Sequence, residues 1–138
     1  MARPLGDGVL VSGQIAPADI AGFAAAGVTR IVNNRPDGEE AGQSAGAEIE
    51  AAARASGLDY AFIPIAGGFS EAQVDAMAVA LADAEGDVLL FCKSGTRSTY
   101  LWALSRARHG TDPDELVSQA AQTGYDLSPI LPWLQRGS

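Results

Sequence analysis

The sequence predicts a single α/β domain: a mostly parallel sheet of four or five strands, with helices on both faces. Short apolar runs alternate along the chain with segments of helical spacing, which favours parallel strands joined by helices. The 138 residues are 47% hydrophobic and 19% charged, which is enough apolar sequence for one core and too little chain for two. The run DVLLFC at residues 87–92 lacks polar alternation, as strands buried on both faces do. We therefore expect residues 1–138 to form one domain.

The first half of the chain predicts two strand-and-helix units. The glycine-bounded run at residues 8–15 predicts a strand. Residues 17–26 predict a helix, because a proline stands at a first helical position and a glycine just past the end. The β-branched run at residues 28–34 predicts a buried strand, which an Arg-Pro pair ends. After an acidic, turn-rich segment, the Ala-rich stretch at residues 47–57 predicts a second helix.

The middle of the chain predicts a third unit. Residues 58–68 predict a strand whose Pro64 suits an end or an edge, because proline cannot donate to a ladder. Ser70 and Gln73 have the spacing of a capping box, and apolar residues follow at helical intervals until residue 85.

The last third predicts the centre of the sheet and the helices that follow it. Residues 87–92 form the most apolar short run and are expected to be the central strand. A helix is expected from near residue 98 to 109, where basic residues precede a glycine. A further helix at residues 113–123 and a short helical piece at 128–135 complete the chain. Two tryptophans are assigned to packing: Trp102 and Trp133.

Charge and cysteine content exclude several classes of function. Nine Lys and Arg against 17 Asp and Glu give a net charge of −8, so nucleic acid and anionic membranes are not expected partners. A single cysteine excludes an intrachain disulfide and a multi-cysteine metal site, and neither a metal nor a cofactor is implied. No apolar run approaches the roughly 18 residues of a membrane span, and the N-terminus lacks a signal-peptide pattern. We expect a cytoplasmic protein, and the sequence does not indicate its oligomeric state.

The candidate functional site is the segment CKSGTRS, which joins the central strand to the next helix. Ligands of open α/β sheets bind beyond the carboxyl ends of the strands. The unpaired amides and dipole of a helix N-terminus attract an anion, and Gly95 lets the backbone turn those amides inward. The residues expected to hold the anion are Lys93, Ser94, Gly95, Thr96 and Arg97.

Three side chains of this segment carry the expected chemistry. The field that attracts an anion also stabilises a thiolate, so Cys92 is expected to be a nucleophile at neutral pH. Arg97 offers a planar fork that can hold two oxygens of a bound anion. Ser98 can donate a hydrogen bond to the sulfur or serve only as a helix cap. A cysteine ending an apolar strand is often mere packing, but consecutive small and polar residues ending in arginine favour a functional loop.

Two levels of resemblance follow from these residues. The spacing of Cys92 and Arg97, followed by Ser98, resembles the phosphate-binding loop of cysteine-dependent tyrosine and dual-specificity phosphatases. The segments VSGQIAPADIAGFAAAGVTRIVNNRPDGEE, FCKSGTRS and LWAL resemble the bacterial beta-lactamase hydrolase-like phosphatase-like family, over most of residues 8–127. The resemblance implies a compact dual-specificity-phosphatase-like domain, with Cys92 as nucleophile and Arg97 as the phosphate-holding arginine.

The chain departs from the phosphatase pattern at three places. The phosphatase loop has one residue more between Cys and Arg than the four present here. Phe91 precedes the cysteine where those enzymes have histidine, and residues 66–68 replace the segment with their general-acid aspartate. The shorter loop also resembles that of single-domain rhodaneses, in which a ring of amides stabilises a cysteine persulfide.

A substitute proton donor would have to come from another strand end. Asp37 follows the strand at residues 28–34, with Glu39 and Glu40 close by, and is our candidate acid. The alternative is that this segment is an acidic, solvated turn, since Pro, Asp and Gly are ordinary turn residues. Arg35 could reach the ligand or neutralise those acids.

Three functions therefore stay open. The first is a phosphoric monoester hydrolase for phosphotyrosine or small aryl phosphates, which forms a phosphocysteine on Cys92. The second is a rhodanese-like sulfurtransferase, in which Cys92 accepts sulfane sulfur from a donor such as thiosulfate. The third is a non-catalytic module that binds phosphorylated ligands. Whole-chain resemblance favours the first, which is our prediction, whereas loop length and the missing general acid favour the second.

Overall fold

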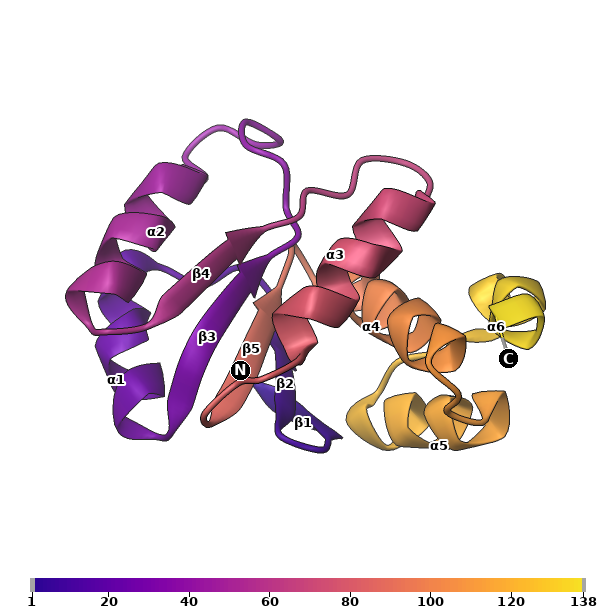
Figure 1. The fold of residues 1–138 in the computed structure, drawn as a ribbon. Helices are drawn as coiled ribbons and strands as arrows, with labels where there is room; N and C mark the ends of the chain where they lie inside the picture. Colours follow the sequence, from indigo (N-terminus) through magenta and orange to yellow (C-terminus); the bar gives the residue numbers. More distant parts are fainter. Residues whose placement is uncertain (1, 138) are drawn as a thin grey trace.

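The computed structural model describes residues 2–137, in which a five-stranded sheet lies between two layers of helices (Figure 1). The strands are β1 (Arg3–Gly6), β2 (Val9–Ser12), β3 (Val28–Asn33), β4 (Asp59–Phe62) and β5 (Asp87–Phe91). Their order in the sheet is β1-β2-β5-β3-β4. β1 pairs with β2 in antiparallel fashion, and the other three pairings are parallel. The predicted α/β class and the mostly parallel sheet are therefore confirmed.

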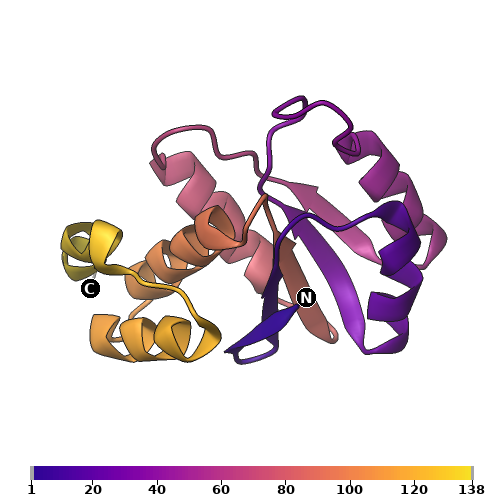
Figure 2. The ribbon, with the colours of Figure 1, turned by 180° about the vertical axis from the view of Figure 1, so that it is seen from behind.

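The helices divide between the two faces of the sheet (Figures 1 and 2). One face carries α1 (Ile20–Ala25), which follows a 3-10 turn at Pro17–Asp19, and α2 (Gly46–Ala55). The other face carries α3 (Glu71–Leu81), α4 (Thr96–Arg108), α5 (Pro113–Thr123) and α6 (Leu131–Gly137), with a 3-10 turn at Ser128–Ile130. Within residues 2–137, no helix combines the length and apolar character that crossing a membrane requires.

β5 is the centre of the sheet and is buried on both faces, as its apolar sequence predicts. Val88 and Leu90 belong to the core beneath α3, α4, α5 and α6. Leu89 and Phe91 point the other way, into the smaller core beneath α1 and α2. Because β2 and β3 flank β5 on either side, its carboxyl end opens between two neighbouring parallel strands. That end is where the candidate loop begins.

The N-terminal strand β1 was not predicted. It covers four residues, includes a proline and a glycine, and has no apolar run of its own. It forms a tight hairpin with β2, through a turn in which Gly6, Asp7 and Gly8 all have positive φ. Its pairing with β2, rather than its own composition, makes it a strand.

The remaining elements follow the sequence closely. Ser70 and Gln73 form the predicted capping box at the start of α3. β4 is shorter than expected, since it ends before Pro64. It lies at the edge of the sheet, which is where a strand next to a proline is expected, because proline has no N–H to donate to a neighbouring strand. α4 begins two residues earlier than predicted, at Thr96. The candidate arginine therefore lies in the first turn of a helix.

Two exposed glycines, one just before β5 and one within α1, test this packing in opposite directions. A Cβ on Gly86 would lie 2.6 Å from the Gly27 carbonyl oxygen, whereas a Cβ on Gly22 within α1 would meet nothing within 4 Å. We expect Gly86→Ala to lower the free energy of unfolding by about 1–3 kcal/mol, because backbone must move. Gly22→Ala should raise it by up to about 1 kcal/mol through helix propensity. Urea unfolding measures both, and equal effects would contradict the described packing.

Candidate active site

Cys92 lies directly after β5 with its side chain buried, and the loop that follows turns its backbone toward the sulfur. The Gly95 N–H donates to Cys92 Sγ at 3.1 Å. Gly95 has φ +92°, in the left-handed region, and is the N-cap of α4. A thiolate at this position is stabilised both by that N–H and by the positive end of the helix. The loop therefore directs a backbone amide and the start of α4 at the Cys92 sulfur.

Neighbouring segments hold the loop from two sides. On one side, the Gln14 N–H donates to the Lys93 carbonyl at 3.3 Å. Gly13 allows this close approach, because a Cβ there would lie 3.0 Å from the same oxygen. On the other side, the Tyr125 hydroxyl donates to the Ser94 carbonyl at 2.9 Å. The two exposed residues of the loop thus have fixed backbone positions.

Arg97 projects from the first turn of α4 and is held by a carboxylate. Its Nη1 and Nη2 donate to the two oxygens of Glu39, at 2.7 and 2.9 Å, and Nη1 also donates to the Ile65 carbonyl at 2.8 Å. These bonds use three of the five guanidinium N–H groups. The Nε–H and one Nη2–H remain, which together form the side edge of the fork. Hydrogen bonding to Glu39 first, and the nearby Cys92 in smaller part, raise the pKa of Arg97.

Glu39 is the centre of a small network of charges. Its hydrogen bond with Arg97 is the main reason why its pKa falls to about 2, and Arg35 contributes as well. Arg35 is buried and donates from all three of its nitrogens, to Glu39, Glu40 and Gln14. These contacts correspond to the second alternative stated above, in which Arg35 neutralises the acidic segment. Arg35 contributes to the site by fixing Glu39.

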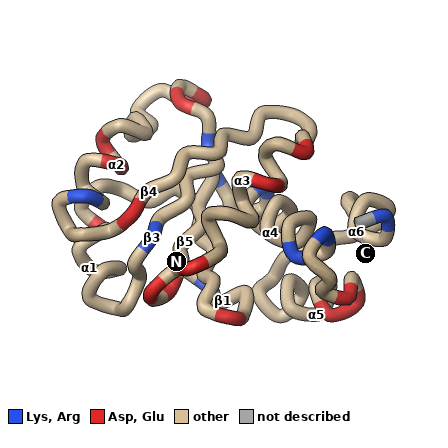
Figure 3. Tube along the Cα trace, viewed as in Figure 1, with Lys and Arg blue, Asp and Glu red and all other residues tan. Residues whose placement is uncertain are grey.

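The acidic segment between β3 and α2 is itself an ordered loop. The Gln43 amide oxygen accepts the backbone N–H groups of Glu39 and Glu40, and its nitrogen donates to the Pro36 carbonyl at 2.9 Å. Glu40 Oε1 also lies 3.6 Å from Lys93 Nζ, and Lys93 is the residue that follows Cys92. Figure 3 shows acidic positions on the loop that joins β3 to α2. Carboxylates therefore border the candidate anion site.

Ser98 has a different partner from the one suggested by the sequence. Its hydroxyl donates to Asn34 Oδ1 at 2.8 Å, and both side chains are buried. Asn34 in turn donates to the Ile63 carbonyl at 2.9 Å. A hydroxyl has one hydrogen to donate, so in this arrangement Ser98 ties α4 to the ends of β3 and β4 and does not donate to sulfur.

Asp37 lies in the loop between β3 and α2, and its side chain reaches the first residue of α2. Its Oδ1 accepts the Gly46 N–H at 2.7 Å, which satisfies one of the free amides of that helix. Thr96 bonds locally, with its hydroxyl 3.1 Å from that of Ser94. The structure thus brings Cys92 and Arg97 together with the loop amides, and occupies Asp37 with a helix terminus.

Sequence reasoning missed three contributors to this site. It noted Glu39 as a neighbour of Asp37 but not as the partner of Arg97, and it did not identify the Ile65 carbonyl. The position of Glu39 after a strand end was the available signal. Nothing in the local sequence marks Tyr125, which is 31 positions from its partner Ser94.

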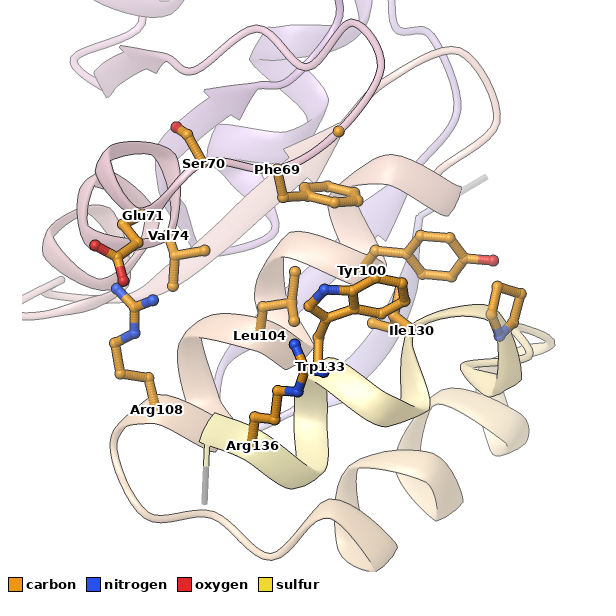
Figure 4. A pocket seen from close by; sticks show the side chains of 12 residues that line it. Phe69, Ser70, Glu71, Val74, Tyr100, Leu104, Arg108, Ile130, Trp133 and Arg136 are labelled. Atoms are coloured by element: carbon orange, nitrogen blue, oxygen red, sulfur yellow. The ribbon is translucent and has the colours of Figure 1, made fainter.

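A groove of about 820 Å³ opens along α4, beyond the cysteine loop (Figure 4). Its walls come from the start of α3, from α4 and from α6, and Cys92 is not among its lining residues. Tyr100, one helical turn after Arg97, lies in it next to Trp133. Trp133 is 55% exposed, so its assignment to packing is wrong, whereas Trp102 is buried as expected. The groove is therefore separate from the cysteine loop, since none of residues 92–97 lines it.

Comparison with known sequences agrees with these features. Residues 2–109 match the family described as the beta-lactamase hydrolase-like protein, phosphatase-like domain. Beta-lactamase hydrolase-like proteins of Xylella fastidiosa and Agrobacterium fabrum are 41% and 39% identical over 128 and 130 residues, which is 91% and 93% of this chain. The chain spans about 30% of the length of these relatives.

Solved structures give the same result. A protein of Neisseria meningitidis, crystallised as a candidate phosphatase, is 28% identical with a TM-score of 0.84, covering 98% of this chain and 96% of its own. Tk-PTP (17% identical, TM-score 0.73, 98% and 93% covered) and the kinase associated phosphatase (15%, 0.75, 93% and 84%) share the fold. The predicted dual-specificity-phosphatase-like fold is confirmed. The chain belongs to the phosphatase-like domain family of beta-lactamase hydrolase-like proteins.

Proposed function

We propose that this domain is a cysteine-dependent phosphatase that hydrolyses aryl phosphate monoesters, such as phosphotyrosine, through a phosphocysteine. The observation that carries the proposal is the pairing of a buried cysteine, whose sulfur accepts the Gly95 N–H, with Arg97, which interacts with the same cysteine and has N–H groups that Glu39 does not take. The family match supports phosphate esters as the substrate class. The oxygens of a bound phosphoryl group need planar, charged donors, which Arg97 supplies.

The reaction would take place in two displacements at phosphorus. The Cys92 thiolate forms an S–P bond as the P–O bond to the aryl group breaks, and the aryl oxide leaves with that electron pair. Water then attacks the phosphocysteine, so that the S–P bond breaks and inorganic phosphate and thiolate are released. The loop amides and the side edge of Arg97 stabilise the charge on the phosphoryl oxygens in both steps. Glu39 keeps that edge turned toward the loop.

The identity of the proton donor limits the substrates. Glu39 has a pKa of about 2 while Arg97 holds it, so about one molecule in 100,000 carries the proton at pH 7. Asp37 remains our candidate acid, and its bond to the Gly46 N–H would have to be given up or shared. Aryl oxides leave with less assistance than alkyl oxides, because they are weaker bases. This consideration favours phenolic esters over phosphoserine or phosphothreonine.

A sulfurtransferase is the second candidate, and the length of the loop favours it. Four residues separate Cys92 from Arg97, which provides one amide fewer than the usual phosphatase loop. A persulfide is a smaller group than a phosphoryl group, and the groups that leave in its formation and transfer, sulfite and then the Cys92 thiolate, need no proton donor. In this reaction Cys92 would take sulfane sulfur from thiosulfate, releasing sulfite, and pass it to an acceptor thiol or cyanide.

The two functions are separated by a paired assay on one preparation. We expect phosphate release from a phosphotyrosine peptide and from p-nitrophenyl phosphate, and no such release by Cys92→Ser, because serine is not ionised at neutral pH. In parallel, the protein is treated with thiosulfate and examined by mass spectrometry. A gain of one sulfur on Cys92 with transfer to cyanide, and no phosphate release, would favour the sulfurtransferase and overturn the phosphatase.

The role of Asp37 as proton donor is tested with two substrates whose leaving groups differ in their need for a proton. Asp37→Asn keeps an oxygen for the Gly46 N–H but cannot give a proton. If Asp37 is the acid, the variant loses about 100-fold or more in kcat with phenyl phosphate and much less with p-nitrophenyl phosphate, whose leaving group needs no proton. Steady-state kinetics on both esters measures the difference. An equal loss on both would assign Asp37 to structure alone.

The role of Glu39 in orienting Arg97 is tested by comparing Glu39→Gln with Glu40→Gln. Glu39→Gln removes the bidentate carboxylate from Arg97, so the side edge of the fork loses its fixed direction. We expect the KM for p-nitrophenyl phosphate to rise about tenfold, and inhibition by inorganic phosphate to weaken in parallel. Glu40→Gln is the matched control, because Glu40 contacts Arg35 and Lys93 and should change KM less than about twofold. A lower KM in Glu39→Gln would instead show that Glu39 competes with phosphate.

A further inference from the structure

One peptide unit of the loop has specific partners at both ends. The peptide between Ser94 and Gly95 presents its N–H to Cys92 Sγ at 3.1 Å and its carbonyl to the Tyr125 hydroxyl at 2.9 Å. In a trans peptide these two groups point in opposite directions. The orientation that satisfies Tyr125 is therefore the one that directs the N–H at the sulfur.

This peptide needs an external support, because Gly95 does not restrain it. Glycine adopts positive and negative φ about equally well, so the plane of the preceding peptide can rotate at low cost. Rotation by half a turn would point the Ser94 carbonyl, instead of the N–H, at the sulfur. A carbonyl oxygen facing a thiolate is repulsive. The bond from Tyr125 opposes this rotation directly.

Gly95 and Tyr125 also fit one another sterically. A Cβ on Gly95 would collide with the Tyr125 hydroxyl and with its ring carbon Cζ. The absence of a side chain at Gly95 is what lets the phenol reach the loop. Gly95 thus has both the positive φ and the close contact with the Tyr125 hydroxyl, and both favour the same orientation of the peptide between Ser94 and Gly95.

Tyr125 is held in place by an element far from the loop in sequence. It follows α5, where its N–H donates to the Ala120 carbonyl at 2.9 Å. The end of α5 is tied to β1, because Thr123 donates to the Pro4 carbonyl and Arg3 donates to the Thr123 carbonyl. Burial, and then the nearby Cys92, raise the pKa of the Tyr125 phenol, while Arg3 opposes the shift. The phenol accordingly keeps its hydrogen at neutral pH and remains a donor.

We propose that Tyr125 is a positioning residue for the nucleophile: by holding the Ser94 carbonyl, it fixes and polarises the Gly95 N–H that stabilises the Cys92 thiolate. Hydrogen bonds in series polarise one another, so the first bond strengthens the second. The inference requires Cys92 to act as a thiolate, as the proposed function does, but not that phosphate be its substrate. It would apply equally to a persulfide-forming cysteine.

The test is the pH dependence of Cys92 alkylation by iodoacetamide, in which the thiolate displaces iodide. Tyr125→Phe keeps the ring and removes the donor. We expect the midpoint of the pH profile to rise by about half to one pH unit, which is about three- to tenfold less thiolate at a pH below both midpoints. The other charged groups near this chain of bonds are unchanged: Arg97 with its partner Glu39, Lys93 with Glu40, and Arg3 beside Tyr125.

Tyr60→Phe is the matched control. Tyr60 is also a partly buried phenol whose pKa is raised by burial, and it is bonded to Asn33 near the start of α2. Its loss should leave the alkylation midpoint within about 0.2 pH unit of the unmodified protein, whatever it does to the unfolding temperature. A change in midpoint that appears in both variants would indicate general loosening and would overturn the proposal.

A second readout follows the bond itself. The amide proton of Gly95 in a 15N-labelled sample should move to a lower chemical shift in Tyr125→Phe, because its hydrogen bond to sulfur weakens. If the unmodified protein alkylates with a low midpoint and Tyr125→Phe changes neither the midpoint nor this resonance, the positioning role fails while the nucleophile stands. If alkylation of the unmodified protein occurs but its pH profile has a midpoint above 8, the thiolate at neutral pH fails, and with it the proposed function.

Discussion

The hydrogen bond from the Gly95 N–H to the Cys92 sulfur is the contact on which the site depends, and the fold imposes it. β5 is covered on both faces and flanked by β2 and β3, so the segment that follows it emerges at the carboxyl edge of the sheet. It must then enter α4 within a few residues, because that helix packs onto one of those faces. Reversal over so short a distance requires a left-handed residue, and Gly95 provides it. The same turn directs an amide at the side chain that ends the strand.

Charge compensation is the second condition that shapes the site. On a chain of net charge −8, the site gathers three cationic side chains, of which Arg97 and Arg35 are at least partly buried. A buried guanidinium needs acceptors for its N–H groups, and two glutamates with one glutamine provide them. Glu39 satisfies Arg97 at one edge of the fork, and Cys92 interacts with the same guanidinium. The acidic loop thus holds the guanidinium of Arg97 in place near Cys92.

The sequence was sufficient for the sheet centre and the loop, and insufficient for their long-range partners. Residues 87–92 and the capping box at Ser70 have local causes, namely apolar character and side-chain spacing, so they could be identified directly. β1 could not, because its strand conformation comes from pairing with β2. Likewise, Ser98 bonds Asn34, which is 64 positions away, and Tyr125 reaches Ser94 across two helices. Such contacts are set by how helices pack, which spacing along the chain does not encode.

The charge of the chain also affects how fast an anionic ligand would reach Cys92. On a chain of net charge −8, a phosphorylated ligand would approach from a distance against a field of its own sign, and it would meet the cation Lys93 only at close range. Dissolved ions screen such repulsion over about 8 Å at physiological ionic strength. Added salt should therefore speed the encounter of this domain with a dianion, the reverse of what it does to proteins that attract their anionic ligands electrostatically.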